Sequence, residues 1–346
     1  MAVTQAPRTR SDAVPLRTYR TQGRPSAIAG IGVHVPDRVL TNRDLEEMVD
    51  TSDQWITERT GIKERRLAEA GTPTFELATG AARAALERAE TRPEDLDMIL
   101  VATSTPDAPF PSVACRVQNE LGVSGCCAMD VLAACSGFAY ALSLADAYVA
   151  SRRADTILVI GAEVLSRYVD WTDRSTCVLF ADGAGAAVVR PAGRGAGFRS
   201  WCLGADGRGF DKITVGSDIA RGTFAAGEEG PRIGMKGPDV FKFATDIFIR
   251  QAHSVAAAAG VTMDDIDLWV PHQANRRIIE AAAQRVGLPM ERVMVNIDRF
   301  GNTSTATIPL ALDDALRQGR LHRGDNVLIA GFGSGLTWAA CLLEWE

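Results

Sequence analysis

The sequence of 346 residues has few lysines, no Cys-x-x-Cys pair and no long apolar run. Four of its 37 positive charges are lysines, a bias that reflects genome composition and has no functional meaning by itself. The seven cysteines are an odd number without paired spacing, which argues against a zinc ribbon and a disulfide framework. No apolar span of about 18 residues and no signal-peptide pattern is present. We therefore expect a cytoplasmic protein with reduced thiols, no metal and no membrane partner.

The charge balance also lacks a positive excess. With 43 acidic residues the net charge is −6, whereas a general nucleic-acid binder carries a basic face. The composition, 46% hydrophobic and 23% charged, is that of a globular protein. Dividing the length by roughly 150 residues per domain predicts about two domains.

Apolar strands alternate with helices over most of the chain. Residues 1–25 are rich in arginine, threonine and proline without apolar periodicity, which predicts a flexible leader. After it the pattern predicts strands at 27–33, 97–103, 126–132 and 155–161, and helices at 75–90, 112–121 and 136–152. Short apolar strands between helices are typical of a mostly parallel sheet buried on both faces, and thus of an α/β fold.

The second half of the chain repeats the order of the first. The segment from Asp95 corresponds to that from Asp265, and the strand from Ile157 to that from Val327, both at an offset of 170. The pair Met129-Asp130 is matched with Ile297-Asp298 at an offset of 168. We therefore predict two similar α/β halves, an N-terminal half over 26–198 and a C-terminal half over 199–346.

Three residues with chemical potential follow predicted strands. Cys135 opens the long helix after the strand 126–132, His272 follows the strand 265–270, and Asn302 lies at the turn that corresponds to that of Cys135. Chemistry in α/β sheets gathers at the carboxyl ends of strands, so these turns are expected to meet in one pocket. The helix start should favour the thiolate of Cys135. His272 can transfer a proton or donate a hydrogen bond, and Asn302 can donate to an oxygen that gains charge.

The remaining cysteines and histidines are interpreted as structural or surface residues. Six cysteines lie in apolar segments and are expected to be small buried hydrophobes: Cys115, Cys126, Cys127, Cys177, Cys202 and Cys341. His34, His253 and His322 have no polar cluster around them, which favours surface or loop positions.

Six segments together resemble the β-ketoacyl-acyl-carrier-protein synthase III family of the thiolase fold. They are residues 52–61, 133–137, 180–185, 270–275, 301–304 and 331–338. The resemblance runs from about residue 26 to the C-terminus. It implies duplicated α/β halves in a layered α-β-α-β-α architecture, and an acyltransferase without a cofactor that initiates fatty-acid synthesis.

The resemblance also implies a reaction in two halves. Cys135 would take an acyl group from acyl-CoA, and the backbone N–H groups of Cys135 and Ser334 would form the oxyanion hole. Malonyl-acyl-carrier protein (malonyl-ACP) would then lose carbon dioxide, with His272 and Asn302 stabilising the enolate. The resulting carbanion would attack the acyl-cysteine and give a 3-oxoacyl-carrier protein. The nature of the primer, whether acetyl, branched or longer, stays open.

Binding residues follow from the same resemblance. Trp55 and Arg59 would flank the adenine of CoA, with Arg174 as a third contact. Phe110 would reach across the interface of a homodimer and close the partner's acyl pocket. Acyl carrier protein would bind a basic rim around His272, made of Gln273, Ala274, Asn275, Arg276, Arg277 and Lys242, with Arg285 close by.

Several other functions compete with this one. A Cys–His–Asn hydrolase has the same residue types in the same order but lacks the duplicated pattern. A biosynthetic thiolase needs a second catalytic cysteine near its end, where Cys341 lies in a strand. Elongating synthases use a second histidine at the position of Asn302, chalcone-synthase-like enzymes are longer, and a non-catalytic subunit has no need of all three polar residues. A priming ketosynthase or acyltransferase of a polyketide or other secondary-metabolite pathway shares every motif and stays open.

Overall fold

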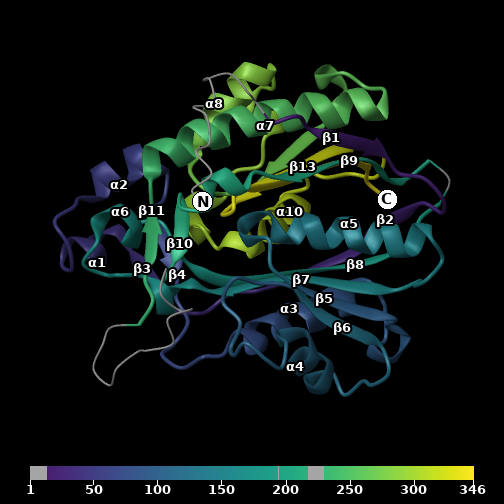
Figure 1. The fold of residues 1–346 in the computed structure, drawn as a ribbon, viewed down its shortest axis with the longest axis horizontal. Coiled ribbons are helices and arrows are strands. Elements are labelled where there is room, and N and C mark those ends of the chain that lie inside the picture. Colours follow the sequence, from purple (N-terminus) through teal and green to yellow (C-terminus); the bar gives the residue numbers. More distant parts are fainter. Residues whose placement is uncertain (1–13, 194, 217–229) are drawn as a thin grey trace, which may run out of the picture.

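The molecule consists of five alternating layers of helices and sheets (Figure 1). The computed structural model describes residues 14–193, 195–216 and 230–346. The outer layers hold α3 (Thr74–Arg88) with α4 (Val113–Glu120) and α7 (Gly237–Ala259) with α8 (Arg276–Val286), and the central layer holds α5 (Gly137–Ala150) and α10 (Thr307–Arg317). A five-stranded sheet lies on each side of the central layer. This arrangement confirms the predicted α-β-α-β-α thiolase fold.

The first sheet belongs to the N-terminal half. Its strands are β2 (Ser26–His34), β5 (Met98–Ala102), β6 (Cys127–Val131), β7 (Ile157–Val164) and β8 (Asp182–Pro191). They lie in the order β2-β8-β7-β5-β6, with β5 parallel to both neighbours and β8 antiparallel to both of its own. β5 and β7 are buried along their whole length, as their apolar sequences predict.

The second sheet repeats this plan. Its strands are β1 (Arg17–Arg20), β9 (Gly197–Ala205), β12 (Leu268–Pro271), β13 (Asn326–Gly333) and β14 (Thr337–Glu344). Their order is β1-β9-β14-β13-β12, with β12 and β13 parallel. The order β9-β14-β13-β12 therefore reproduces β2-β8-β7-β5 of the first sheet.

Shorter elements join the two sheets and cover the ends of their strands. The two-stranded ribbons are β3 (Val39–Thr41) with β4 (Glu64–Arg66) and β10 (Ile213–Val215) with β11 (Ile233–Met235). The short helices are α1 (Asn42–Glu46), α2 (Asp53–Thr60), α6 (Arg174–Cys177) and α9 (Ile297–Phe300). Their apolar residues share one buried cluster, so this region packs as a unit.

The register of the strands confirms the duplication. Met98 pairs with Ile157 in the first sheet and Leu268 pairs with Val327 in the second, each residue 170 positions after its counterpart. The match of Met129-Asp130 with Ile297-Asp298 as strands is wrong, because Ile297 begins helix α9. The counterpart of β6 is reduced to a single parallel bridge between Trp269 and Val293.

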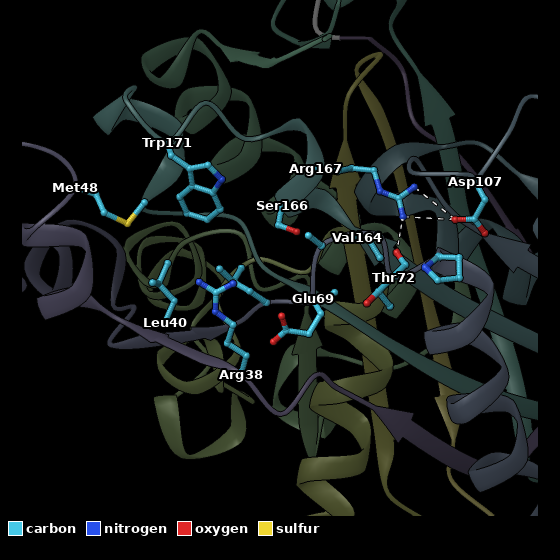
Figure 2. A pocket seen from close by; sticks show the side chains of 15 residues that line it. Arg38, Leu40, Met48, Glu69, Thr72, Asp107, Val164, Ser166, Arg167 and Trp171 are labelled. Carbon is cyan, nitrogen blue, oxygen red and sulfur yellow. Dashed lines mark hydrogen bonds and ion pairs between the residues drawn. The ribbon is translucent and has the colours of Figure 1, made fainter. Parts of the chain in front are cut away.

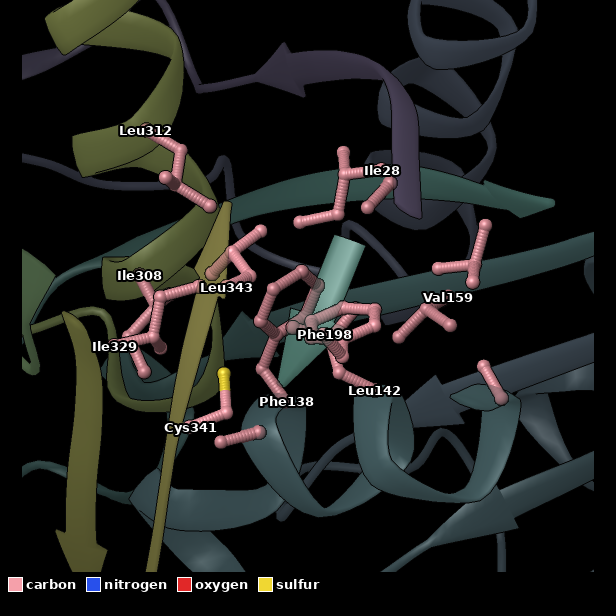
Figure 3. Packing of buried hydrophobic residues seen from close by; sticks show 14 of the residues in the cluster. Ile28, Phe138, Leu142, Val159, Phe198, Ile308, Leu312, Ile329, Cys341 and Leu343 are labelled. Atoms are coloured by element: carbon pink, nitrogen blue, oxygen red, sulfur yellow. The ribbon is translucent and has the colours of Figure 1, made fainter. Parts of the chain in front are cut away.

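The largest hydrophobic cluster lies between the sheets and unites the halves (Figure 3). Phe138 of α5 and Ile308 of α10 are buried there with Val159 of the first sheet and Ile329 and Leu343 of the second. Because one core serves both halves, their relative position is fixed by packing.

The predicted leader over 1–25 is wrong for its last part. Residues 1–13 lie outside the described residues, but Arg17–Arg20 forms β1 and pairs antiparallel with β9. Thr21 then donates a hydrogen bond to Asp146 at 3.1 Å. The segment is polar because it is an edge strand, which needs no apolar alternation to pair.

The cysteines differ in exposure more than the sequence predicts. Cys177, Cys202 and Cys341 are buried, as expected, and all thiols of the described residues are free. The expectation is wrong for Cys115 and Cys127, which are exposed. Cys127 begins the edge strand β6, and Cys115 lies on the outer side of α4, so neither is covered by a further layer. The three histidines expected at the surface are exposed.

Candidate functional site

One pocket of about 320 Å³ contains the residues to which the sequence points. Cys135, His272 and Asn302 all line it, and they come from different halves of the chain. Cys135 lies in the turn η2 (Ala134–Ser136) before α5, His272 directly follows β12, and Asn302 precedes the turn η8 (Ser304–Ala306) before α10. The expected meeting of these turns is confirmed, since η2 and η8 pack against each other.

The nucleophile turn depends on a glycine in the opposite half. Ala134 has a φ of 47°, a strained value for a residue with a side chain. A Cβ at Gly333 of β13 would lie 2.6 Å from the backbone nitrogen of Cys135 and 3.0 Å from Cβ of Ala134. The absent side chain therefore lets β13 press against the turn. Gly161 of β7 does the same for η8, with a Cβ position 2.4 Å from the carbonyl oxygen of Thr305.

Burial decides the protonation of Cys135. It raises the pKa of the thiol to about 12, with a smaller contribution in the same direction from the charge of Glu163. A hydrogen bond from the Ser304 side chain opposes this shift without cancelling it. The expected stabilisation of the thiolate by the helix start is thus outweighed, because desolvation penalises a charged sulfur. The free protein holds a neutral thiol that needs a base.

His272 is a buried, neutral imidazole with a fixed orientation. It is 1% exposed, and its ring packs edge-on against Phe332 with 5.4 Å between centroids. Burial lowers the pKa of the imidazole to about 3. Its Nδ1 lies 2.6 Å from Oγ1 of Thr307, and its backbone N–H donates to the carbonyl of Ala330 at 2.8 Å. The ring is therefore uncharged at neutral pH, and one of its two nitrogens carries no proton.

Asn302 is oriented by backbone contacts on both sides. Its N–H donates to Leu179 at 2.9 Å, and its carbonyl accepts from Ala181 at 3.0 Å, so the motif at 180–185 holds it in place. Its side-chain Oδ1 accepts the N–H of Ser304 at 2.9 Å. With the oxygen engaged, the NH₂ group of the side chain remains as the donor for the pocket.

A buried carboxylate beside the pocket was not singled out from the sequence. Glu163 of β7 is fully buried and accepts hydrogen bonds from Thr105 Oγ1 at 2.8 Å, Thr305 Oγ1 at 3.1 Å and Ser104 N–H at 3.1 Å. Burial raises the pKa of this carboxyl group. The bond from Thr305 to Glu163 links the two halves. It lies close to Cys135, because Thr305 follows Ser304, whose side chain contacts the thiol. A charged residue inside an otherwise apolar strand was the available signal.

Comparison with known proteins gives the family. The profile described as "3-Oxoacyl-[acyl-carrier-protein (ACP)] synthase III" matches residues 129–207, and that of its C-terminal part matches residues 256–345. The β-ketoacyl-[acyl-carrier-protein] synthase III of Caldanaerobacter subterraneus subsp. tengcongensis is 48% identical over 324 residues, covering 93% of this chain and 98% of the relative. The chain belongs to the β-ketoacyl-[acyl-carrier-protein] synthase III family.

Solved structures agree in fold. The 3-oxoacyl-[acyl-carrier-protein] synthase III of Aquifex aeolicus is 46% identical, with a TM-score of 0.87 over 92% of this chain and 100% of that one. The priming β-ketosynthase of the R1128 polyketide pathway is 35% identical, with a TM-score of 0.88 over 94% of this chain and 98% of that one. The chain is accordingly an acyltransferase of the condensing type.

Two of the three residues expected to bind CoA line the same pocket. Trp55 and Arg59 of α2 line it, as does Ser175, the neighbour of Arg174. The guanidinium of Arg174 lies over the indole of Trp55, 4.9 Å from the ring centroid, and also donates to the carbonyl of Asp50 at 2.9 Å. In this structure the indole of Trp55 is thus stacked on Arg174, the residue expected as a third contact of CoA.

The expected carrier-protein rim is partly exposed and partly internal. Arg276 and Arg277 are exposed at the start of α8, although Arg276 is paired with Glu280 at 2.7 Å. Lys242 on α7 and Arg285 on α8 are exposed too. Ala274 and Asn275 line the pocket, and the side chain of Asn275 caps α8.

Gln273 does not belong to that rim. It is 1% exposed, and its side chain bonds the backbones of Pro271, Met294 and Asn296. Its expected role in carrier binding is wrong, because a side chain with every polar group used internally has none left for a partner.

Two further expected residues lie near or outside the pocket. Ser334 follows Gly333, which lines the pocket, and its hydroxyl donates to the carbonyl of Ile213 at 2.6 Å. Phe110 is 83% exposed and is absent from the pocket of its own chain.

A larger hollow of about 740 Å³ contains none of these residues (Figure 2). Arg38, Ser166, Arg167 and Trp171 are among its lining residues. Arg167 is paired with Asp107 at 3.5 Å, and Ser166 donates to Asp182 at 2.6 Å, so two of its polar groups are engaged inside the chain. Within 14–193, 195–216 and 230–346 no cluster of metal-ligating side chains is found, nor a helix long and apolar enough to cross a membrane.

Proposed function

We propose that the chain condenses an acyl-CoA primer with malonyl-ACP and so initiates fatty-acid synthesis. The observation that carries this proposal is the meeting of a thiol, an imidazole and an amide in one pocket of a chain of this family. No step of this reaction requires a cofactor, since the thioesters supply the activated carbon. Cytoplasmic location remains a prediction.

Acylation is the first half of the reaction. Cys135 and His272 line the same pocket, and both are uncharged, which supports a transfer of the thiol proton to the imidazole. The sulfur attacks the acyl carbonyl, and the bond between that carbon and the sulfur of CoA breaks. The N–H groups of Cys135 and Ser334 hold the oxyanion formed on the way. The packing of Gly333 against the turn supports this assignment, because it brings the chain before Ser334 next to Cys135.

Decarboxylation is the second half. As carbon dioxide leaves the malonyl group, negative charge builds on the thioester oxygen. The NH₂ group of Asn302, left free by the bond of Oδ1 to Ser304, donates to that oxygen together with His272. The enolate carbon then attacks the acyl carbonyl on Cys135 and releases the 3-oxoacyl product.

CoA and the carrier protein approach the pocket from the side of α2 and α8. Trp55, Arg59 and Arg174 offer an aromatic face and two guanidinium groups for the adenine nucleotide. The exposed cations Arg276, Arg277 and Lys242 form a basic rim that suits an acidic carrier protein despite the net charge of −6.

A homodimer accounts for an otherwise unprotected edge. Strand β6 is the last of its sheet, and the adjacent Leu132 and Phe110 are 78% and 83% exposed. An open strand edge flanked by exposed apolar side chains is suited to pairing with a second copy. The same contact would carry Phe110 into the partner's pocket.

A priming ketosynthase of a polyketide pathway is the second candidate. The R1128 enzyme supports it with a TM-score of 0.88, but its identity of 35% is below the 48% of the β-ketoacyl-[acyl-carrier-protein] synthase III of Caldanaerobacter subterraneus. Fatty-acid initiation is therefore the better supported pathway.

The test is the complete reaction. The chain is incubated with a panel of acyl-CoAs and malonyl-ACP, and the carrier protein is analysed by mass spectrometry. We expect a 3-oxoacyl-carrier protein with the wild type and none with Cys135→Ala. A product that forms equally with the variant would refute the proposal.

A further inference from the structure

Thr307 lies behind the imidazole of His272 and belongs to none of the motifs that define the site. It is the first residue of α10 and is 1% exposed, like His272 itself. Its Oγ1 has two polar neighbours, Nδ1 of His272 at 2.6 Å and the carbonyl oxygen of Ser304 at 2.9 Å. Both distances are those of hydrogen bonds.

The two contacts together determine the tautomer of the imidazole. A hydroxyl has one proton, and the carbonyl of Ser304 can only accept, so the hydroxyl of Thr307 donates to Ser304. The contact with His272 then requires that Nδ1–H donates to Oγ1. The opposite arrangement would leave two oxygens facing each other at 2.9 Å without a proton between them. Because burial keeps the ring neutral, the proton on Nδ1 leaves Nε2 without one.

We infer that Thr307 is a positioning residue that holds His272 as the Nδ1–H tautomer and leaves its Nε2 as a proton acceptor for the pocket. The assignment agrees with the second observation at this site, a neutral thiol on Cys135 that needs a base. Thr307 itself contacts neither substrate in this account and acts through the ring of His272.

The inference rests on the proposed function and adds the path of the proton. In acylation the thiol proton of Cys135 moves to Nε2, the sulfur attacks the acyl carbon, and the C–S bond to CoA breaks. The departing CoA thiolate takes the proton from Nε2, which returns the ring to its neutral form. Throughout, Nδ1–H stays bonded to Thr307.

The second half of the reaction uses the same anchored ring. The entering malonyl carboxylate raises the pKa of His272 from its low value in the free protein, because opposite charges stabilise each other, and Nε2 takes up a proton from solvent. The doubly protonated ring donates from Nε2 to the enolate oxygen while carbon dioxide leaves. When the new C–C bond forms and the bond to Cys135 breaks, the thiolate takes that proton. One proton is thus consumed for each carbon dioxide released.

The first test reads the tautomer directly. ¹⁵N NMR of the full-length, histidine-labelled protein distinguishes protonated from bare ring nitrogens, and His272→Gln identifies the signals of His272. We expect a protonated Nδ1 and a bare Nε2 in the wild type and in Thr307→Ser, which keeps the hydroxyl. Thr307→Val, which has nearly the same shape without the hydroxyl, should shift the ring toward the Nε2–H tautomer. A wild-type ring that carries its proton on Nε2 would overturn the inference.

The second test reads the rate of Cys135 acylation by acyl-CoA. General base catalysis contributes about 10²–10⁴-fold, so Thr307→Val should lower kcat by about tenfold or more with KM for acyl-CoA unchanged. Thr307→Ser should stay within about threefold of the wild type. If Thr307→Val and the wild type are acylated at equal rates and have the same tautomer, the role of Thr307 is refuted while the proposed function stands. A wild type that is never acylated would refute the proposed function and leave the tautomer measurement valid.

Discussion

At the scale of single residues, burial sets the chemistry of the pocket. It raises the pKa of the Cys135 thiol to about 12 and lowers the pKa of the His272 imidazole to about 3. At neutral pH both groups are therefore uncharged, and no thiolate–imidazolium pair is present before substrate binds. The polar contacts that remain, from Thr307 and Ser304, orient donors and acceptors without adding charge.

The low pKa of His272 has a consequence for stability. The folded value of about 3 lies below the ordinary value of 6.5, so the unfolded chain binds the proton first as the pH falls. The contribution of this group to stability is present above pH 6.5 and is lost progressively toward pH 3. We predict that His272→Gln removes this component.

Urea unfolding at several pH values between 7 and 4 checks that prediction. The difference in unfolding free energy between wild type and His272→Gln should change in favour of the variant as the pH falls. His253→Gln, which replaces an exposed histidine of α7, is the matched control. A difference for His272→Gln that is the same at pH 7 and pH 4 would contradict the account.

Asn302 separates the two half-reactions. Asn302→Ala removes a donor to the enolate oxygen but leaves the thiol and its base in place, so acylation of Cys135 should persist. Decarboxylation of malonyl-ACP should fall by about 10²–10³-fold, the usual cost of one such donor. Release of labelled carbon dioxide and mass spectrometry of the acyl-enzyme measure the two steps. A parallel loss of both would assign Asn302 a different role.

At the scale of elements, one strand of each half packs closely against a turn of the other half. β13 packs on η2 and β7 packs on η8, and each contact depends on a glycine. At the offset of 170 residues Gly161 corresponds to Gly331 and Thr305 to Cys135, and a Cβ at Gly331 would likewise meet the carbonyl oxygen of Cys135, at 3.5 Å. Duplication has thus produced two equivalent turns, of which one carries the thiol and the other follows Asn302.

Gly333→Ala tests the packing of β13 on the nucleophile turn. The new methyl group would lie 2.6 Å from the nitrogen of Cys135 and 3.1 Å from that of Ser136, which are backbone atoms and cannot turn aside. We expect destabilisation of about 1–3 kcal/mol, typical of overpacking, and a strong loss of acylation. Gly207→Ala, at a position with nothing within 4 Å, is the matched control. Normal acylation of Gly333→Ala would show that the turn tolerates displacement.

At the scale of the whole molecule, neither half contains the site. Cys135 comes from the first half and His272 and Asn302 from the second, and buried polar bonds cross between the halves. Examples are Thr305 to Glu163 at 3.1 Å and the indole of Trp201 to Asp146 at 2.8 Å. The shared core and these bonds make the pocket a property of the complete chain.

The basic rim is tested by reversing one charge. Arg277→Glu should raise KM for the carrier protein much more than KM for acyl-CoA, because only the former is an acidic macromolecule. Arg323→Glu is the matched control. Arg323 precedes β13, at the end of the strand away from Gly333 and the pocket, so this variant should keep both KM values near those of the wild type. Equal increases in both KM values for Arg277→Glu would contradict a docking role.

The duplicated fold and the pocket could be predicted, because the features that produce them are visible in the sequence. Strand and helix lengths preserve the 170-residue offset, and parallel sheets bring their strand ends together, so Cys135, His272 and Asn302 could be placed in one site. Exposure could not be predicted in the same way. Cys127 is exposed because β6 lies at an edge, and strand order is a tertiary property.

Hydrogen-bond partners could not be predicted from the sequence either. Gln273 stands beside exposed arginines, and only the backbones that surround its side chain show that it is internal. The raised pKa of Cys135 needed its three-dimensional burial, which outweighs the helix start. The pairing of Thr307 with His272 joins positions 35 residues apart and follows from no local pattern.

Intact-protein mass spectrometry after incubation with acyl-CoA tests the central claim most directly. The account predicts a single acyl adduct on the wild-type chain, located at Cys135 by peptide mapping, and its discharge when malonyl-ACP is added. Cys135→Ala should give no adduct, while the exposed Cys115 and Cys127 serve as internal controls that stay unmodified. Undiminished acylation of Cys135→Ala, or an adduct that malonyl-ACP does not discharge, would contradict it.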